Sequence, residues 1–213
     1  MPQIPQSLSI EPYMPLIQRA VNQFWQTRQA QQATQKQNKQ IQDIGSRSAV
    51  TGGQQLNGFL TLFKQIALDL GIPEVCIYTR NNHLPGFFRP TKDWDFVFIN
   101  PDKKLGVVIE LKSQVGPSFG NNFNNRSEEA LGSALDLWTA FREKAFPNQT
   151  APWLGYLVIV EKASGSIKPV GLQGSHYLPR AEFKGTSYLD RYQLLCQKLV
   201  LERHYTSAAL LWT

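Results

Sequence analysis

Apolar side chains recur at helical spacing in several parts of the chain. Residues 56–70 place them three and four positions apart, which predicts an amphipathic helix. Residues 127–146, with Asn125 or Ser127 as the cap, and residues 187–205 show the same period. Residues 15–42 are also predicted to form a long helix, because glutamine, alanine and lysine dominate them. Apolar positions are sparse there, so only the first half of that helix has a clear face to bury.

Short apolar runs predict strands at 75–78, 93–99, 105–112 and 154–160. The two middle strands are joined by the polar stretch 100–104, which suits a hairpin. The remaining segments are polar or rich in glycine and proline and are expected to be irregular: 45–55, 81–90, 113–126 and 161–186. This order of elements predicts an α/β fold, a small central sheet flanked by helices, in a single domain that spans residues 1–213.

The composition narrows the class of protein. The 213 residues are 42% hydrophobic, and no apolar run approaches the ~20 residues that a bilayer span requires. Residues 1–6 lack the pattern of a secretory signal. Cys76 and Cys196 are too few for a disulfide scaffold and are expected to be reduced core residues. These features predict a cytoplasmic protein with no membrane contact.

The formal charge of +6 is distributed unevenly. Between residues 14 and 50, a single acidic residue, Asp43, is outnumbered by basic ones: Arg19, Arg28, Lys36, Lys39 and Arg47. The excess predicts an arm that lies on a phosphate backbone, so that affinity for DNA falls with salt. The simpler alternative is a solvated helix, which is the usual reason for a run of charges.

The strand predicted at 105–112 separates its side chains by polarity. Because side chains alternate across a strand, one face is uniformly apolar, and the other ends in Glu110 and Lys112. Acid-x-Lys tripeptides also occur at 102–104 and 182–184, and about one is expected by chance, so the tripeptide alone is a weak motif. Only 110–112 lies in a strand with a fully apolar face.

A hairpin brings a second acid close to this pair. Pairing around a turn centred near Asp102 places Asp95 opposite Ile109 or Glu110, within ~5 Å of its partner at the Cβ atoms. Asp102 follows a proline, but it lies at the tip of the hairpin, roughly 25 Å from Glu110 at ~3.3 Å per residue, and is rejected on distance. The sequence therefore predicts that Asp95, Glu110 and Lys112 converge.

These three side chains suit phosphodiester hydrolysis. The carboxylates of Asp95 and Glu110 would hold a hard divalent cation, Mg²⁺ above all. A bound cation polarises a phosphate and activates water, and the Lys112 ammonium would interact with a phosphate oxygen or orient the attacking water. The simpler alternative is an ordinary salt bridge at the rim of the sheet.

A polar block follows the strand and is predicted to be a loop that enters a DNA groove beside the scissile phosphate. Asparagine can pair with adenine and arginine with guanine, so Arg126 is the best candidate for a guanine. About half of these side chains are expected to form turns and caps instead. The predicted DNA-binding residues are Ser113, Gln114, Ser118, Asn121, Asn122, Asn124, Asn125 and Arg126, together with Arg89 and Lys92 before the site. His83 could approach DNA, and Glu128 and Glu129, placed at the start of the next helix, are expected to act mainly as caps.

Residues 110–130 (ELKSQVGPSFGNNFNNRSEEA) resemble the signature of the XhoI-type restriction endonucleases. Supporting matches lie before and after this block, and the resemblance runs from about Pro15 to the end: 84–95, 134–140, 152–156 and 187–192. The 21-residue block is far more specific than acid-x-Lys.

The resemblance implies a PD-(D/E)XK nuclease fold, a mixed central sheet flanked by helices. It implies a Mg²⁺-dependent homodimer that cuts double-stranded DNA at the palindrome CTCGAG and leaves 5′ overhangs with 5′-phosphate ends. Carried over to this chain, Asp95 and Glu110 would bind the metal and Lys112 would be the catalytic lysine. Trp94 stands where the motif has proline, a loosely kept position. A cognate DNA methyltransferase is expected in the same prokaryotic host.

Other functions are weighed against this one. Residues 116–120 match the serine-hydrolase elbow G-x-S-x-G around Ser118, and Asp136 or Asp190 and then His204 follow in order. That class is disfavoured because the next helix is predicted to begin only near Ser127 and because parallel strands are too few. A non-catalytic DNA-binding protein would explain the charge but not the paired acids with lysine. A PD-(D/E)XK nuclease of another role, such as repair, is a third alternative.

Overall fold

The computed structural model describes residues 9–37, 54–146, 148–174 and 176–213. The chain forms two compact units, residues 1–74 and 75–213. The single domain predicted to span both units stays a prediction. In the described part of the chain, no helix is both long and apolar enough to cross a bilayer.

The first unit is built from two helices, α1 (Met14–Gln37) and α3 (Asn57–Asp69), preceded by the short helix η1 (Glu11–Tyr13). Buried Phe24 and Phe59 form its core. The helices approach closely, since a Cβ atom added at Gly58 would lie 2.8 Å from the Ala20 Cα. Both helices were predicted, and α1 is confirmed as far as Gln37. Residues 38–42 of the predicted helix lie outside the described residues, as do three charges of the basic arm, Lys39, Asp43 and Arg47.

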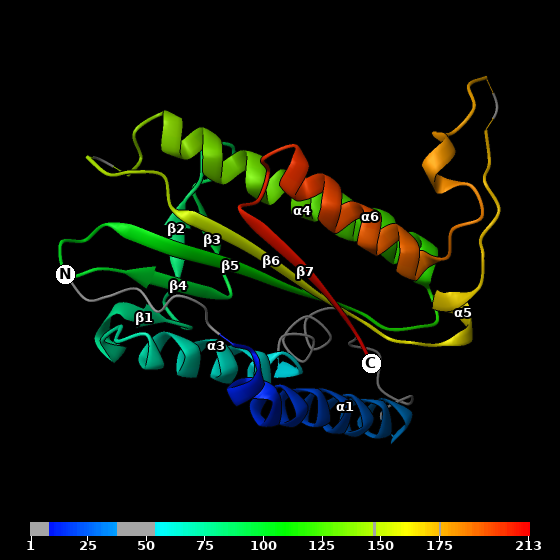
Figure 1. Cartoon of the computed structure of the whole chain (residues 1–213), viewed down its shortest axis with the longest axis horizontal. Helices are drawn as coiled ribbons and strands as arrows, with labels where there is room; N and C mark the ends of the chain where they lie inside the picture. Colours follow the sequence, from blue (N-terminus) through cyan, green and yellow to red (C-terminus); the bar gives the residue numbers. More distant parts are fainter. Residues whose placement is uncertain (1–8, 38–53, 147, 175) are drawn as a thin grey trace. The chain divides into compact units, whose positions relative to one another are not determined.

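The second unit holds a five-stranded mixed sheet in the order β1-β4-β5-β6-β7 and a separate two-stranded sheet, β2-β3 (Figure 1). Strand β4 pairs antiparallel with both β1 and β5, whereas β6 pairs parallel with both β5 and β7. In chain order the elements are η2 (Glu74–Cys76), β1 (Ile77–Tyr78), β2 (His83–Pro85), β3 (Thr91–Asp93), β4 (Phe96–Ile99), β5 (Leu105–Gln114), α4 (Phe119–Arg142), β6 (Trp153–Val160), α5 (Ser164–Ile167), η3 (Ala181–Phe183), α6 (Tyr188–Leu201) and β7 (Ser207–Trp212). The predicted fold class, a mixed sheet with helices, is confirmed.

Helices α4 and α6 cover one face of this sheet (Figure 1). Parallel strands need a crossover connection, and α4 supplies it between β5 and β6, while α6 supplies it between β6 and β7. Their apolar stripes bury against the strands in one core, whose members include Val108, Leu154, Tyr156, Val158, Ala130, Ala134, Leu137, Tyr192, Cys196 and Leu199. Cys196 and Cys76 are free and buried, as predicted.

The prediction of a loop over residues 113–126 is wrong. Strand β5 continues to Gln114, and α4 begins at Phe119, with Ser118 as its N-cap rather than Asn125 or Ser127. Tertiary packing overrides the modest helix propensity of the asparagines. Phe119 stacks on Tyr188, and the Phe123 ring meets the Tyr192 ring edge to face at 5.1 Å between centroids.

Three smaller predictions also change. The strand predicted at 93–99 divides in two, because the chain leaves β3 at Asp93 and joins the large sheet only at Phe96. Half of the strand predicted at 75–78 is the short helix η2, and β2 lies within the segment predicted to be irregular at 81–90. Strand β7 was not predicted.

Candidate active site

The β4–β5 hairpin has the predicted register. Phe96 pairs with Ile109 and Val97 with Val108, which places Asp95 beside Glu110. The Asp95 amide donates to the Ile109 carbonyl at 3.2 Å, and the Leu111 amide donates to Asp95 Oδ2 at 2.6 Å. One backbone–backbone bond therefore fixes the main chain of Asp95 against β5, and one bond from a backbone amide fixes its carboxylate.

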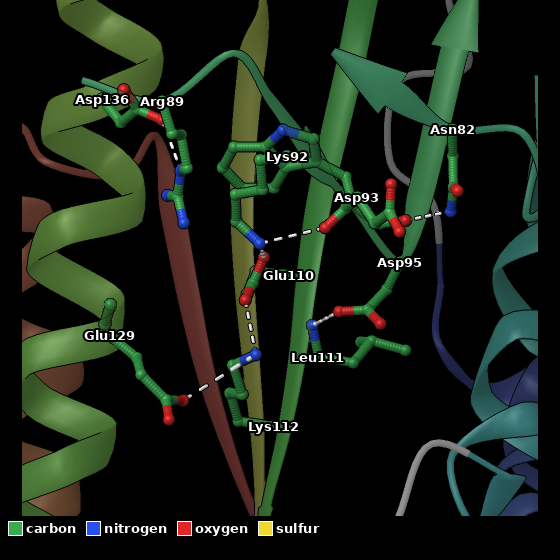
Figure 2. A network of polar contacts seen from close by, with 12 residues as sticks. Asn82, Arg89, Lys92, Asp93, Asp95, Glu110, Leu111, Lys112, Glu129 and Asp136 are labelled. Carbon is green, nitrogen blue, oxygen red and sulfur yellow. Dashed lines mark hydrogen bonds and ion pairs between the residues drawn. The ribbon is translucent and has the colours of Figure 1, made fainter. Parts of the chain in front are cut away.

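Glu110 is the centre of the polar network (Figure 2). Its side chain is only 1% exposed, although it is charged, and it lies on the face of β5 that α4 covers. Lys112 Nζ lies 2.6 Å from Glu110 Oε1, and Lys92 Nζ lies 2.8 Å from Oε2. The three predicted catalytic residues, Asp95, Glu110 and Lys112, are thus brought together, and a second lysine joins them.

Lys92 reaches this position from the other sheet. It lies on β3, just before the chain crosses at Trp94 and Asp95 into the large sheet. Its ammonium also donates to the Asp93 carbonyl at 3.0 Å and lies 4.4 Å from the centre of the Trp94 ring. Lys92 was predicted to contact DNA, and no sequence signal indicated its contact with Glu110, because that contact depends on the change of sheet.

Helix α4 brings a third acid to the edge of the site. Glu129 Oε2 lies 3.9 Å from Lys112 Nζ and pairs with Arg126 one turn earlier. Because α4 begins at Phe119, neither Glu128 nor Glu129 opens the helix, and the expected capping role is wrong. Figure 2 shows the Glu129 side chain pointing from α4 toward Lys112.

The other predicted DNA-binding residues fall into groups by exposure. Ser118, Asn121, Asn124 and Asn125 are exposed on the first turns of α4, and Ser113, Asn122 and Arg126 are partly buried. Gln114 is only 1% exposed, and its amide accepts from the Tyr192 hydroxyl at 3.2 Å and donates to the Val115 carbonyl at 2.9 Å. This burial argues against the predicted contact of Gln114 with DNA.

Arg89 and its neighbours are tied to α4 by one buried carboxylate. Asp136 Oδ1 accepts from the Phe87 and Phe88 amides, each at 2.8 Å, and Oδ2 accepts from Arg89 Nε at 2.7 Å. The contact gives Arg89 a structural role beside its predicted one at DNA. His83 pairs with Asp93 across the same small sheet.

The serine-hydrolase alternative fails on geometry, although one reason for rejecting it was wrong. The helix after Ser118 begins at once, at Phe119. However, Asp136 is engaged by Arg89, and Asp190 caps its own helix through Ser187. The His204 carbonyl accepts from the Trp138 indole near the other end of α4, and Trp138 lies roughly 30 Å along the helix from Ser118 at ~1.5 Å per residue.

Comparison with known proteins decides the family. The profile of the family described as "Restriction endonuclease XhoI" matches residues 34–213. The chain belongs to the XhoI restriction endonuclease family. This confirms the resemblance and the predicted class of enzyme, a type II restriction endonuclease.

Curated relatives agree with this assignment. The type II restriction enzyme BstVI of Geobacillus stearothermophilus is 51% identical over 181 residues, which are 82% of this chain and 81% of the relative. The type II restriction enzyme XhoI of Xanthomonas vasicola is 45% identical over 199 residues, 92% and 79% of the two chains. AbrI of Azospirillum brasilense is 42% identical over 163 residues, 75% and 72%. No solved structure matches the chain.

The electrostatics of this restriction endonuclease suit a divalent cation. Burial, and then repulsion from Glu110, raise the pKa of Asp95 to about 6. Burial alone would lower the pKa of Lys112, but the adjacent Glu110 carboxylate outweighs it and raises that pKa. A cation between the two carboxylates would relieve the repulsion that raises the pKa of Asp95.

The donor set also fits Mg²⁺. Asp95 and Glu110 offer hard oxygen ligands, and the buried Glu110 Oε2 has the Lys92 ammonium, 2.8 Å away, as its ionic partner. Among the described residues, no cluster of three or more acidic, histidine or cysteine side chains is placed to hold a metal. The remaining ligands would therefore be water or substrate, as is usual for Mg²⁺.

The raised pKa of Asp95 predicts a pH-dependent loss of stability in the metal-free enzyme. The unfolded carboxyl has the lower pKa, so protonated Asp95 stabilises the fold fully below that value, and this contribution disappears as pH rises through about 6. Thermal unfolding in chelator should show wild type losing stability between about pH 4 and 6 relative to Asp95→Asn. If the stabilities of the two proteins changed with pH in the same way, the raised pKa of Asp95 would be contradicted.

Proposed function

We propose that this restriction endonuclease cuts both strands of double-stranded DNA at a short palindrome, with Mg²⁺ as its cofactor. The observation that carries the proposal is the convergence of Asp95, Glu110 and Lys112 in one hairpin register. The relative named XhoI, at 45% identity, and the resemblance stated above support CTCGAG as the palindrome.

Each side chain has a distinct role in the proposed reaction. Asp95 and Glu110 would hold the Mg²⁺, which would polarise the scissile phosphate and stabilise its developing charge. Lys112, held at 2.6 Å by Glu110, would place its ammonium on a phosphate oxygen or on the attacking water. Water adds to phosphorus as the bond to the 3′ oxygen breaks, which leaves a 5′-phosphate and a 3′-hydroxyl.

A homodimer follows from the palindrome, because two-fold symmetry in the protein matches two-fold symmetry in the DNA. The exposed polar residues at the start of α4 would read the bases, since they lie on the helix that also carries Glu129 to the site. A cognate methyltransferase would protect the host DNA.

Mapping the ends of cut DNA tests this function. Purified protein is incubated with a sequenced plasmid and Mg²⁺, and the termini are sequenced, with Glu110→Gln as the matched inactive control. Discrete fragments that all end at one palindrome with 5′-phosphates are expected. Binding of DNA without cleavage under any divalent metal would favour a non-catalytic binding protein, and scattered ends would favour a nuclease of another role.

A further inference from the structure

Lys92 and Lys112 both contact the buried carboxylate of Glu110, one lysine at each of its two oxygens. Their side chains are only 12% and 22% exposed, and that of Glu110 is 1% exposed. Asp95 and Glu110 carry two negative charges, and the two lysines carry two positive charges. The metal-free site is thus balanced, which is the condition for burying so many charged groups.

The two lysines differ in how Glu110 holds them. Lys112 forms a hydrogen bond with the carboxylate in addition to the ionic contact. Lys92 contacts the other oxygen, Oε2, at 2.8 Å, which is longer than the 2.6 Å between Lys112 and Oε1. Lys92 also has other partners in the two residues that follow it, the Asp93 carbonyl and the Trp94 ring. Of the two ammonium groups, the one from Lys92 is therefore the easier to remove from Glu110.

We propose that Lys92 is the resident counter-ion of Glu110 in the metal-free enzyme and that a divalent cation must take its place at Oε2. This inference rests on the proposed function, in which Asp95 and Glu110 hold the metal. The ammonium released from Glu110 stays at the site, tethered by β3, and becomes available to a DNA phosphate. Lys92 therefore stabilises the carboxylates before the metal binds and weakens metal binding at the same time.

Replacing Lys92 by methionine removes the competing charge and keeps the length of the side chain. Binding of Mn²⁺ to the full chain without DNA, measured by titration calorimetry, should become at least about tenfold tighter in Lys92→Met, a typical effect of one charge at a buried site. Lys92→Arg, which keeps the charge, should bind like wild type. Lys104→Met, at an exposed lysine, is the matched control and should change nothing.

Thermal unfolding gives a second measurement. Without metal, Lys92→Met should melt below wild type, because Glu110 has lost a partner, and Mn²⁺ should raise its melting temperature more than that of wild type. If Lys92→Met does not fold, Lys92→Gln supplies the same test with a neutral donor.

The outcomes separate this inference from the proposed function. Loss of the Mn²⁺ signal in Lys92→Met/Glu110→Gln assigns the measured ion to Glu110. Equal or weaker binding of Mn²⁺ by Lys92→Met, with clear binding by wild type, overturns the role of Lys92 and leaves the metal site intact. Absence of binding by both proteins overturns the proposed metal site itself.

Discussion

Glu110→Gln and Asp95→Asn are each expected to reduce DNA cleavage by more than about 10³-fold and to leave most of the DNA binding in place. Each variant keeps the size of the side chain but removes one of the two charges proposed to hold Mg²⁺. A catalytic step that depends on a metal loses most of its stabilisation when a ligand is lost. Phosphate contacts dominate affinity for DNA, so removing an acid should not weaken binding.

Single-turnover cleavage and gel-shift binding on the same DNA measure the two effects separately. Asp102→Asn is the matched control, because Asp102 belongs to another acid-x-Lys tripeptide but lies in the exposed hairpin turn. It should cut like wild type. Loss of cleavage in Asp102→Asn with full activity in Asp95→Asn would show that the wrong acid has been assigned.

The catalytic hairpin could be predicted because its constraints are local. Alternation of polar and apolar residues fixed which face of β5 carries Glu110 and Lys112, and a short turn fixed the register that brings Asp95 to them. The bulge between Phe98 and Ile99 shifts pairing only beyond the site, toward the turn. The convergence of the three residues could therefore be predicted from two short segments that are close in the sequence.

Contacts between distant segments could not be predicted in this way. The first turns of α4 have the composition of a loop, and they are helical because Phe119 and Phe123 pack on aromatic rings from α6. The four-residue spacing of these two phenylalanines was the available signal. No such signal was available for Lys92, because it lies in the two-stranded sheet and Glu110 lies in the five-stranded sheet.

Asp136 is another residue whose role depends on tertiary structure. It is 3% exposed on α4 and holds the tip of the β2–β3 hairpin through two backbone amides and the Arg89 guanidinium. Figure 2 shows its contact with Arg89. The approach is so close that a Cβ atom at Gly86 would lie 2.6 Å from Asp136 Oδ2. Burial alone would raise the pKa of Asp136, but Arg89 and the two amides together lower it. Its stabilising effect is therefore present above the pKa of the unfolded carboxyl and is lost as pH falls through the lower folded value.

Asp136→Ala is expected to lower the free energy of unfolding by about 3 kcal/mol at pH 7, because it leaves two amides and a guanidinium without their acceptor. Arg89→Ala should cost only about 1 kcal/mol, since it removes a half-exposed partner and leaves both amide bonds intact. Urea denaturation measures both values, with Asp102→Ala as the surface control.

The same hairpin carries Lys92, so Asp136→Ala should also weaken the contact of Lys92 with Glu110. The Asp136→Ala protein should therefore bind Mn²⁺ more tightly than the Arg89→Ala protein does. Equal destabilisation by Asp136→Ala and Arg89→Ala would show that the ion pair, rather than the backbone amides, holds the hairpin to α4.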